Sequence, residues 1–241
     1  EKVLQILTDK ENGVIKDLNE IDAVAHRVLH GGEIYKNSVI INDEVMANLE
    51  SLIPLGPLHM PANIAGIKAC QKAMPNLPQT AIFDTAFHAT MPEKAYTYAI
   101  DYKDAEKYHI RKYGFHGTSH KFITQEMAKV LNKPLNEVNI IVAHLGNGSS
   151  LTAVKNGQSV DTTMGLTPLQ GMVMGTRAGD VDATVVQYLC NNKGISVDEA
   201  INYLNKKSGV LGVTGVDSDV RTVEEEAAKG NKRCQLALDM I

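Results

Sequence analysis

The stretch 139–165 constrains the fold more than any other part of the chain, because it spells three short strands joined by two tight turns. Asn-Gly pairs at 147–148 and 156–157 separate runs of apolar and β-branched residues. Such pairs between strand-like runs are strong hairpin signals. The segment therefore predicts an antiparallel three-stranded unit, with strands over 139–143, 151–155 and 158–163.

The first of these turns also offers a place for an anion. Gly146 and Gly148 leave the backbone uncovered by side chains, so its N–H groups, with the hydroxyls of Ser149 and Ser150, can converge on a phosphate. We expect Gly148 to adopt a positive φ, which glycine tolerates and β-branched residues resist. An ordinary hairpin turn is the alternative, and the turn sequence alone does not separate the two.

The rest of the chain alternates strand-like and helix-like segments, which is typical of an α/β protein. The run 113–120 opens a helix for which we expect Thr118 or Ser119 as the N-cap. Its apolar stripe is predicted at Ile123, Met127, Val130 and Leu131. The Gly- and Met-rich run 161–180 is predicted to be a loop with a short helical piece. Further strands are expected at 21–29 and 80–83, and further helices at 43–52, 63–74, 181–190, 197–205 and from residue 222.

Composition excludes several classes of protein. The chain has 241 residues, 44% of them hydrophobic and 22% charged, which is ordinary for a globular protein with a sizeable core. A net charge of −4 without a long basic run argues against a nucleic-acid partner or an anionic membrane surface. No apolar run is long enough to span a membrane. Cys70, Cys190 and Cys234 are too few and too scattered for a disulfide framework, so we expect a reducing cytoplasm.

Three side chains stand where ligands often bind. Arg27 lies near the end of a predicted buried strand, and Asp84 follows directly after another. His116 lies at the start of a predicted helix, where anions are attracted. Each has a structural alternative: Arg27 pairs with a structural carboxylate, Asp84 forms a turn, and His116 is a structural histidine.

A metallohydrolase is disfavoured by the spacing of the histidines. His26 and His30 are four residues apart in a predicted strand, about 13 Å, which is too far to share an ion. His116 and His120 have helical spacing, but no nearby acid completes a ligand set, and the zincin helix motif is absent.

Six motifs, taken in order, resemble those of the acetate kinase family. The resemblance covers nearly the whole chain. It implies an α/β protein with duplicated ribonuclease-H-like domains, the acetate and sugar kinase/Hsp70/actin fold. Residues 1–86 would be the remainder of the N-terminal domain, and 87–241 part of the C-terminal, nucleotide-binding domain. The motifs lie at 26–33, 57–59, 83–88, 113–120, 144–150 and 161–180.

The resemblance implies a role for each matched residue. Asp84, Arg177 and His116 are expected in catalysis, with Asp84 as the catalytic acid. Arg27 is expected to bind the substrate carboxylate. A pocket for the substrate methyl group is expected from Leu29, Leu58, Phe115 and Pro168. The nucleotide phosphates are expected at His144, Leu145, Gly146, Asn147 and Gly148, and the nucleoside at Asp219, Val220 and Arg221.

The implied reaction is reversible transfer of the γ-phosphoryl group of ATP to acetate, with Mg²⁺ as cofactor. A carboxylate is ionised at pH 7 and needs no general base, so Asp84 is better suited to orient magnesium, or a water bound to it, than to remove a proton. Catalysis then rests on positioning and on positive charge. No metal ligand is predicted beyond this action of Asp84 through water.

Three departures from the family pattern affect only the expected substrate preference: Met60 where Asn is usual, Gln170 where Glu is usual, and Leu29 where Val is common. A propionate or butyrate kinase of the same fold is therefore an open alternative. A nucleotide-binding fragment without catalytic activity is another. The resemblance also implies a homodimer.

The two ends of the chain suggest a fragment. The sequence begins at Glu1 without Met and stops at Ile241 in what reads as a helix. The family's first strands, its second Gly-rich loop and a late magnesium-binding Glu have no counterpart. A chain that lacks these parts can be inactive alone, so its activity is left open.

Overall fold

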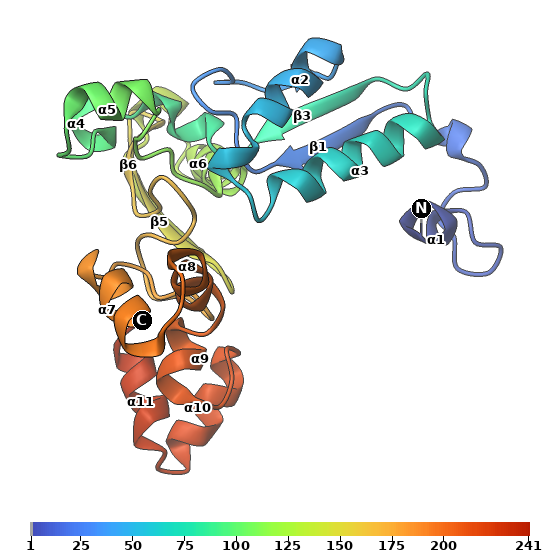
Figure 1. The fold of residues 1–241 in the computed structure, drawn as a ribbon. Helices are drawn as coiled ribbons and strands as arrows, with labels where there is room; N and C mark the ends of the chain where they lie inside the picture. The colour runs from blue at the N-terminus through green and yellow to red at the C-terminus, as the bar shows by residue number, and fades with distance from the viewer. Residues whose placement is uncertain (1) are drawn as a thin grey trace. The chain divides into compact units, whose positions relative to one another are not determined.

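The computed structural model describes residues 2–241 and forms two compact units, Glu1–Ala89 and Thr90–Ile241 (Figure 1). Each unit contains one three-stranded sheet with helices around it. The expected domains, 1–86 and 87–241, divide the chain close to this point. That these units are parts of two ribonuclease-H-like domains stays a prediction.

The sheet of the first unit has the order β1-β3-β2. β1 (Val24–Val28) and β3 (Gln79–Phe83) run parallel with Val28 opposite Phe83, and β2 (Val39–Ile40) pairs antiparallel with β3. α3 (Met60–Ala73) lies between them in sequence and packs against β1 (Figure 1). The parallel register brings the carboxyl ends of β1 and β3 side by side. β1 is shorter than the predicted strand 21–29.

The other helices of this unit are short, and several begin where local chemistry favours it. Asn42 accepts a hydrogen bond from the Val45 N–H and so caps α2, as predicted for 43–52. α3 begins three residues before the predicted start at 63, because Pro61 fits the first turn of a helix. These elements are α1 (Lys2–Leu7), η1 (Leu18–Glu20), α2 (Asp43–Ser51), η2 (Ile53–Leu55) and η3 (Ala86–Thr90), which reaches the boundary between the units.

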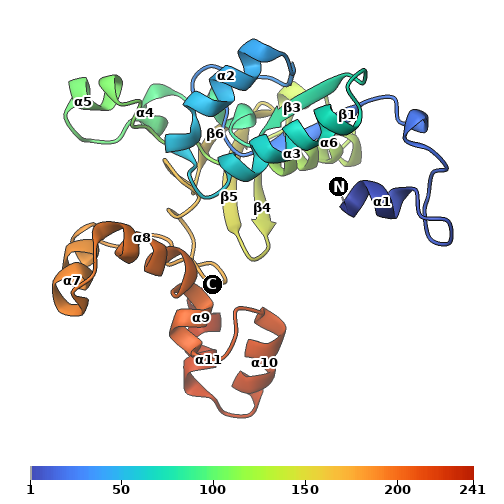
Figure 2. The same ribbon diagram turned by 45° about the vertical axis from the view of Figure 1, so that its right-hand side comes forward.

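The second unit contains the predicted antiparallel meander, and this prediction is confirmed. The strands β4 (Ile140–Leu145), β5 (Ser149–Lys155) and β6 (Gln158–Thr162) lie in the order β4-β5-β6. Figure 2 shows β4 and β5 as a hairpin. Both strands extend to the three-residue turn 146–148, so His144 and Ser150 face each other as a register pair.

The two Asn-Gly turns differ in backbone conformation. Asn156 (φ +52) and Gly157 (φ +74) both have positive φ, as a two-residue hairpin turn requires. The residues with positive φ do not include Asn147 or Gly148, so the expectation for Gly148 is wrong. The turn 146–148 has three residues rather than two, and it does not need the left-handed conformation at Gly148.

α6 (Gly117–Val130) corrects two expectations. Its N-cap is His116, which has φ +57 and makes no side-chain capping bond, rather than Thr118 or Ser119. Its buried face consists of Gly117, His120, Thr124 and Ala128. The predicted apolar stripe is largely exposed; the exposed fractions of Ile123, Val130 and Leu131 are 40%, 76% and 45%. The buried face of α6 is thus made of small and polar residues, with His120 among them.

The loop after β6 also differs from the prediction, since 163–183 contains no helix. Conversely, the Gly-rich run 207–215 forms the helix α9. α9, α10 and α11 bury Val210, Val223, Cys234 and Ala237 in a small core. α11 ends at Asp239, so Ile241 lies outside it.

The remaining elements are α4 (Glu93–Tyr96), α5 (Tyr102–Lys107), η4 (Leu135–Glu137), α7 (Thr184–Lys193), α8 (Val197–Lys206), α9 (Gly209–Thr214), α10 (Val220–Ala228) and α11 (Lys232–Asp239).

No helix within residues 2–241 is both long enough and apolar enough to cross a membrane.

We predict that Gly157→Ala destabilises the protein more than Gly194→Ala. Both glycines have positive φ, +74 and +63, where an L side chain costs about 1–2 kcal/mol. A Cβ at Gly157 would also lie 2.5 Å from the carbonyl oxygen of Leu135, whereas a Cβ at Gly194 has nothing within 4 Å. Urea unfolding of the two variants should differ by at least about 1 kcal/mol, because the crowding adds to the strain. Equal losses would contradict the close approach at Gly157.

Candidate functional site

The first unit places Arg27 and Asp84 together at the carboxyl ends of β1 and β3. Arg27 Nε and Nη2 donate to Asp84 Oδ1 and Oδ2 at 2.8 and 2.6 Å, a bidentate pair. The Asp84 side chain is buried, whereas 65% of the Arg27 side chain is exposed. The hydrogen bond to Asp84 raises the pKa of Arg27. Arg27 therefore does pair with a carboxylate, which was its structural alternative. That carboxylate belongs to Asp84, the other candidate residue of this unit.

The chain after β1 is fixed by buried polar contacts. The Leu29 N–H donates to Asn63 Oδ1, and the Gly31 N–H donates to Thr85 Oγ1. The Gly32 N–H donates to Nδ1 of His30 at 2.9 Å, which requires that this nitrogen carry no proton. Burial lowers the pKa of His30 to about 4, in agreement with a neutral ring. The loop beside Arg27 is therefore held by groups that do not change charge near pH 7.

Leu29 and Leu58, two residues expected to enclose a methyl group, have different surroundings. Leu29 is buried and packs against Gly56, where an added Cβ would lie 2.7 Å from Leu29 Cδ2. The same Cβ would lie 3.0 Å from Cγ of the buried Met60. Leu58 is 57% exposed. Within this unit, Leu29 thus belongs to a packed wall and Leu58 to the surface.

The second unit places a guanidinium and an imidazole over the turn 146–148. A Cβ added at Gly148 would lie 3.3 Å from both Nη1 and Nη2 of Arg177, and 3.5 Å from Nε2 of His116. A Cβ at Gly148 would therefore crowd the Arg177 guanidinium by a few tenths of an ångström and come into ordinary contact with the His116 ring. The Gly175 N–H donates to the carbonyl of Asn147 at 3.1 Å, which ties the loop before Arg177 to the turn.

Arg177 is positioned by the loop that precedes it. Its Nη1 donates to the carbonyl of Pro168 at 2.9 Å and lies 3.7 Å from Met174 Sδ. Burial lowers the pKa of this guanidinium, which nevertheless remains charged. Pro168, expected in the methyl pocket, thus also contacts a catalytic candidate. Phe115, the other expected pocket residue of this unit, is fully buried.

Three histidines of this unit form one cluster around His116. The rings of His116 and His144 stack at 4.0 Å between centroids with a 24° angle between planes. His116 Nδ1 and His120 Nε2 lie 2.9 and 2.8 Å from Ser150 Oγ, and His144 Nδ1 lies 3.0 Å from Ser119 Oγ. His116 reaches this position because it precedes α6 in a left-handed conformation. The sequence prediction identified His116 and His144 but assigned the Ser150 hydroxyl to an anion, whereas the structure buries it against His116 and His120.

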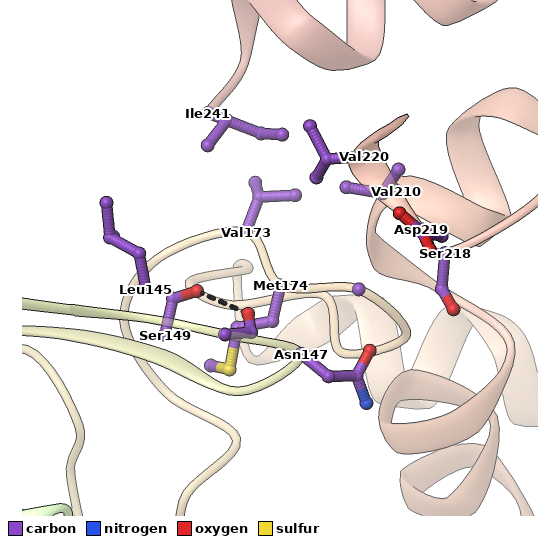
Figure 3. A pocket seen from close by; sticks show the side chains of 12 residues that line it. Leu145, Asn147, Ser149, Val173, Met174, Val210, Ser218, Asp219, Val220 and Ile241 are labelled. Carbon is purple, nitrogen blue, oxygen red and sulfur yellow. Dashed lines mark hydrogen bonds between the residues drawn. The ribbon is translucent and has the colours of Figure 1, made fainter. Parts of the chain in front are cut away.

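A pocket of about 680 Å³ lies beside the turn 146–148, which is a typical size for a small-molecule site. It joins the turn to the start of α10, the region expected to bind a nucleoside (Figure 3). Ser149 donates to the Gly146 carbonyl at 3.0 Å on its floor. The lining residues are Leu145, Gly146, Asn147, Ser149, Val173, Met174, Gly175, Val210, Ser218, Asp219, Val220 and Ile241.

Of the residues expected on the nucleotide, Leu145, Gly146, Asn147, Asp219 and Val220 line this one pocket. His144, Gly148 and Arg221 do not line it. Arg221 forms an exposed bidentate pair with Asp219, which also caps α10 by accepting from the Arg221 N–H. The apolar walls Val173 and Val210 were missed, because nothing in the loop or the Gly-rich run marked them as neighbours.

The residues from 2 to 241 contain no group of three or more His, Cys, Asp or Glu side chains that could hold a metal ion. Magnesium bound to a nucleotide needs fewer protein ligands, because it keeps several waters and takes one or two carboxylates besides the phosphates. Asp84, the carboxylate expected to act through water, is buried and accepts from Arg27 with both of its oxygens.

Comparison with known proteins gives one consistent result. The model of the acetokinase family matches residues 1–241. The acetate kinase of Caldanaerobacter subterraneus subsp. tengcongensis is 56% identical over 240 residues, which are 99% of this chain and 60% of that protein. The chain thus spans about 60% of the length of the curated relatives it matches.

Two solved structures are also similar. The acetate kinase of Porphyromonas gingivalis has a TM-score of 0.93 at 47% identity, covering 99% of this chain and 60% of that one. A propionate kinase from Francisella tularensis subsp. tularensis has a TM-score of 0.90 at 51% identity, covering 93% and 58%.

We predict that Gly148→Val weakens binding of a nucleoside triphosphate, although not for the φ-based reason expected from sequence. The valine side chain would fill the space where the turn backbone and the phosphates are expected to meet, and the loss of one hydrogen bond to a charged group costs about 1.5–3 kcal/mol, roughly 10- to 150-fold in affinity. Calorimetric titration with ATP measures the loss. Gly66→Val is the control, because a Cβ there has nothing within 4 Å. Unchanged affinity in a folded Gly148→Val protein would show that the turn takes no part in binding.

Proposed function

Since the chain belongs to the acetokinase family, we propose that its protein reversibly transfers the γ-phosphoryl group of ATP to acetate, giving acetyl phosphate and ADP. The fold is the predicted one, that of the acetate and sugar kinase/Hsp70/actin superfamily. The observation that carries the proposal is the approach of Arg177 and His116 to the space above Gly148, next to a pocket of nucleotide size.

In this proposal the pocket of the second unit holds the nucleotide. The apolar side chains of Val173 and Val210 provide surface for a base, and the polar Ser218 and Asp219 lie at the start of α10. The turn 146–148 offers backbone N–H groups to the phosphates. The Arg177 guanidinium stands beside that turn, where it would meet the transferred group.

The first unit supplies the groups for the acceptor. Arg27 is mostly exposed and carries a full positive charge, so it can pair with a substrate carboxylate while Asp84 fixes its orientation. The acceptor is ionised at neutral pH, and its oxygen attacks the γ-phosphorus as the bond to the β-phosphate oxygen breaks. No proton has to be removed, which leaves Asp84 free of a general-base role.

Negative charge accumulates on the transferred group, and the chain's own cationic and donor groups would offset it. Arg177 is partly buried, and a charge shielded from water acts more strongly than one in bulk solvent. His116 directs Nε2 to the same space. Magnesium bound to the nucleotide would neutralise part of the phosphate charge, and Asp84 is the residue we propose to act on it through water.

A propionate kinase is the second candidate. The 51% identity to a structure described as a propionate kinase favours it. One methylene changes the fit in an apolar pocket by only about 1–3 kcal/mol, so one fold can serve either acid. A homodimer, a cytoplasmic location and the absence of nucleic-acid or membrane partners stay predictions.

The direct test is phosphorylation of acetate, propionate and butyrate by the protein at its natural length, with acyl phosphate trapped as the hydroxamate. We expect the highest kcat/KM for acetate. The highest value for propionate would favour the second candidate. ATP binding without formation of any acyl phosphate would overturn both.

We predict that Arg177→Ala lowers kcat on the order of 10³-fold, as for loss of an arginine finger, and changes the ATP dissociation constant far less. The reason is that negative charge crowds near this residue only during transfer. Steady-state kinetics and nucleotide titration separate the two effects. Arg233→Ala is the control, because Arg233 also donates to a backbone carbonyl, that of Val213, but lies outside the site. An unchanged kcat would exclude the role.

We predict that Leu29→Ala shifts preference toward longer acids. A filled pocket should penalise propionate by about 1–3 kcal/mol in kcat/KM, roughly 10- to 200-fold, and butyrate more. Removing the side chain would open space against Gly56 and Met60 and leave the acetate methyl less enclosed. The measurement is kcat/KM for the three acids. Leu52→Ala is the control, since both leucines are 7% exposed. Parallel losses on all three acids would mean that Leu29 only supports the fold.

A further inference from the structure

The hydroxyl of Ser150 joins two of the clustered histidines. Ser150 is fully buried in β5, and its Oγ lies 2.9 Å from His116 Nδ1 and 2.8 Å from His120 Nε2. The two histidines are four residues apart at the start of α6, so both rings face the strand from the same side of the helix. A single hydroxyl therefore serves two imidazoles.

The hydroxyl restricts which ring nitrogens carry protons. A serine has one O–H donor and can accept at its lone pairs. It can donate to only one of the two nitrogens, so at least one of His116 Nδ1 and His120 Nε2 must carry a proton. The protonation patterns of the two rings are thus coupled through Ser150.

Phosphoryl transfer at the space above Gly148 would need one of these patterns. Nε2 of His116 faces the space above Gly148, which the Arg177 guanidinium also approaches. The imidazole of His144 stacks on the His116 ring at 4.0 Å between centroids. A nearby cation disfavours a second positive charge on His116. A neutral imidazole with its proton on Nε2 offers a donor toward the transferred group, and it then needs a donor at Nδ1.

We propose that Ser150 is a positioning residue: its hydroxyl donates to His116 Nδ1 and accepts from His120 Nε2–H, and so holds His116 as the tautomer that presents Nε2–H toward the space above Gly148, where the transferred group would lie. This inference rests on the proposed phosphoryl transfer for its functional meaning. The tautomer itself is measurable without turnover. His120 contributes by fixing the direction of the Ser150 hydroxyl.

The first experiment is ¹⁵N NMR of the protein at its natural length with labelled histidine, near pH 7.5, with His116→Gln to identify the signal. We expect His116 with a protonated Nε2 and an unprotonated Nδ1. A proton on Nδ1, alone or on both nitrogens, would overturn the proposal. This result does not depend on which acid is phosphorylated, so it is distinct from a failure of the proposed function.

The second experiment removes the hydroxyl. Ser150→Ala should shift His116 toward a mixture of tautomers and lower kcat about 10- to 100-fold, by analogy with outer hydrogen-bond partners of metal-binding histidines. KM for ATP and acetate should change little, because the variant acts on the donor used in transfer. Ser150→Thr, which keeps the hydroxyl, should restore the tautomer and most of kcat.

Thr152→Val is the matched control. Thr152 lies two residues further along β5, is fully buried, and bonds Thr162 Oγ1 rather than a histidine. It tests the loss of a buried hydroxyl from the same strand, and we expect the tautomer and kcat to be unchanged. Equal effects of Thr152→Val and Ser150→Ala would show a merely structural role, as would a Ser150→Ala protein with normal tautomer and kcat.

Discussion

The site of the second unit depends on one steric constraint, the bare backbone at Gly148. Two side chains from distant segments, Arg177 and His116, approach so closely that a Cβ at this position would crowd the guanidinium and touch the imidazole ring. Their placement requires further specific features: the left-handed His116 before α6, the bond from Gly175 to the turn, and the carbonyl of Pro168 on the guanidinium. A hairpin turn thereby becomes the point where a cation, an imidazole and backbone donors meet.

In the first unit, the main electrostatic feature is an ion pair between the two candidate residues. Its two charged candidates, Arg27 and Asp84, satisfy each other through a bidentate pair, so a buried carboxylate is compensated and a mostly exposed cation is oriented. A structural ion pair and a ligand-binding arginine are therefore compatible descriptions of the same contact.

Local sequence chemistry predicted the meander, the α2 boundary and the order of the motifs, because strand-like runs, turn pairs and caps act over a few residues. Sequence-based prediction failed where the conformation depends on contacts between residues far apart in the chain. Gly148 was expected to need a positive φ, yet space for Arg177 explains the glycine. The apolar stripe of α6 was wrong because His120 and Thr124 face inward instead. Ser150 was placed in the turn, but its role depends on two rings contributed by α6.

The central claim is that the pocket beside the turn 146–148 holds a nucleotide whose phosphates point to Gly148. The most direct measurement is a crystal structure of the protein with bound ADP. The account predicts the base between Val173 and Val210, the ribose near Asp219, and the phosphates on the backbone N–H groups of the turn, next to Arg177. ADP bound elsewhere, with the turn empty and Arg177 still on the Pro168 carbonyl, would contradict it.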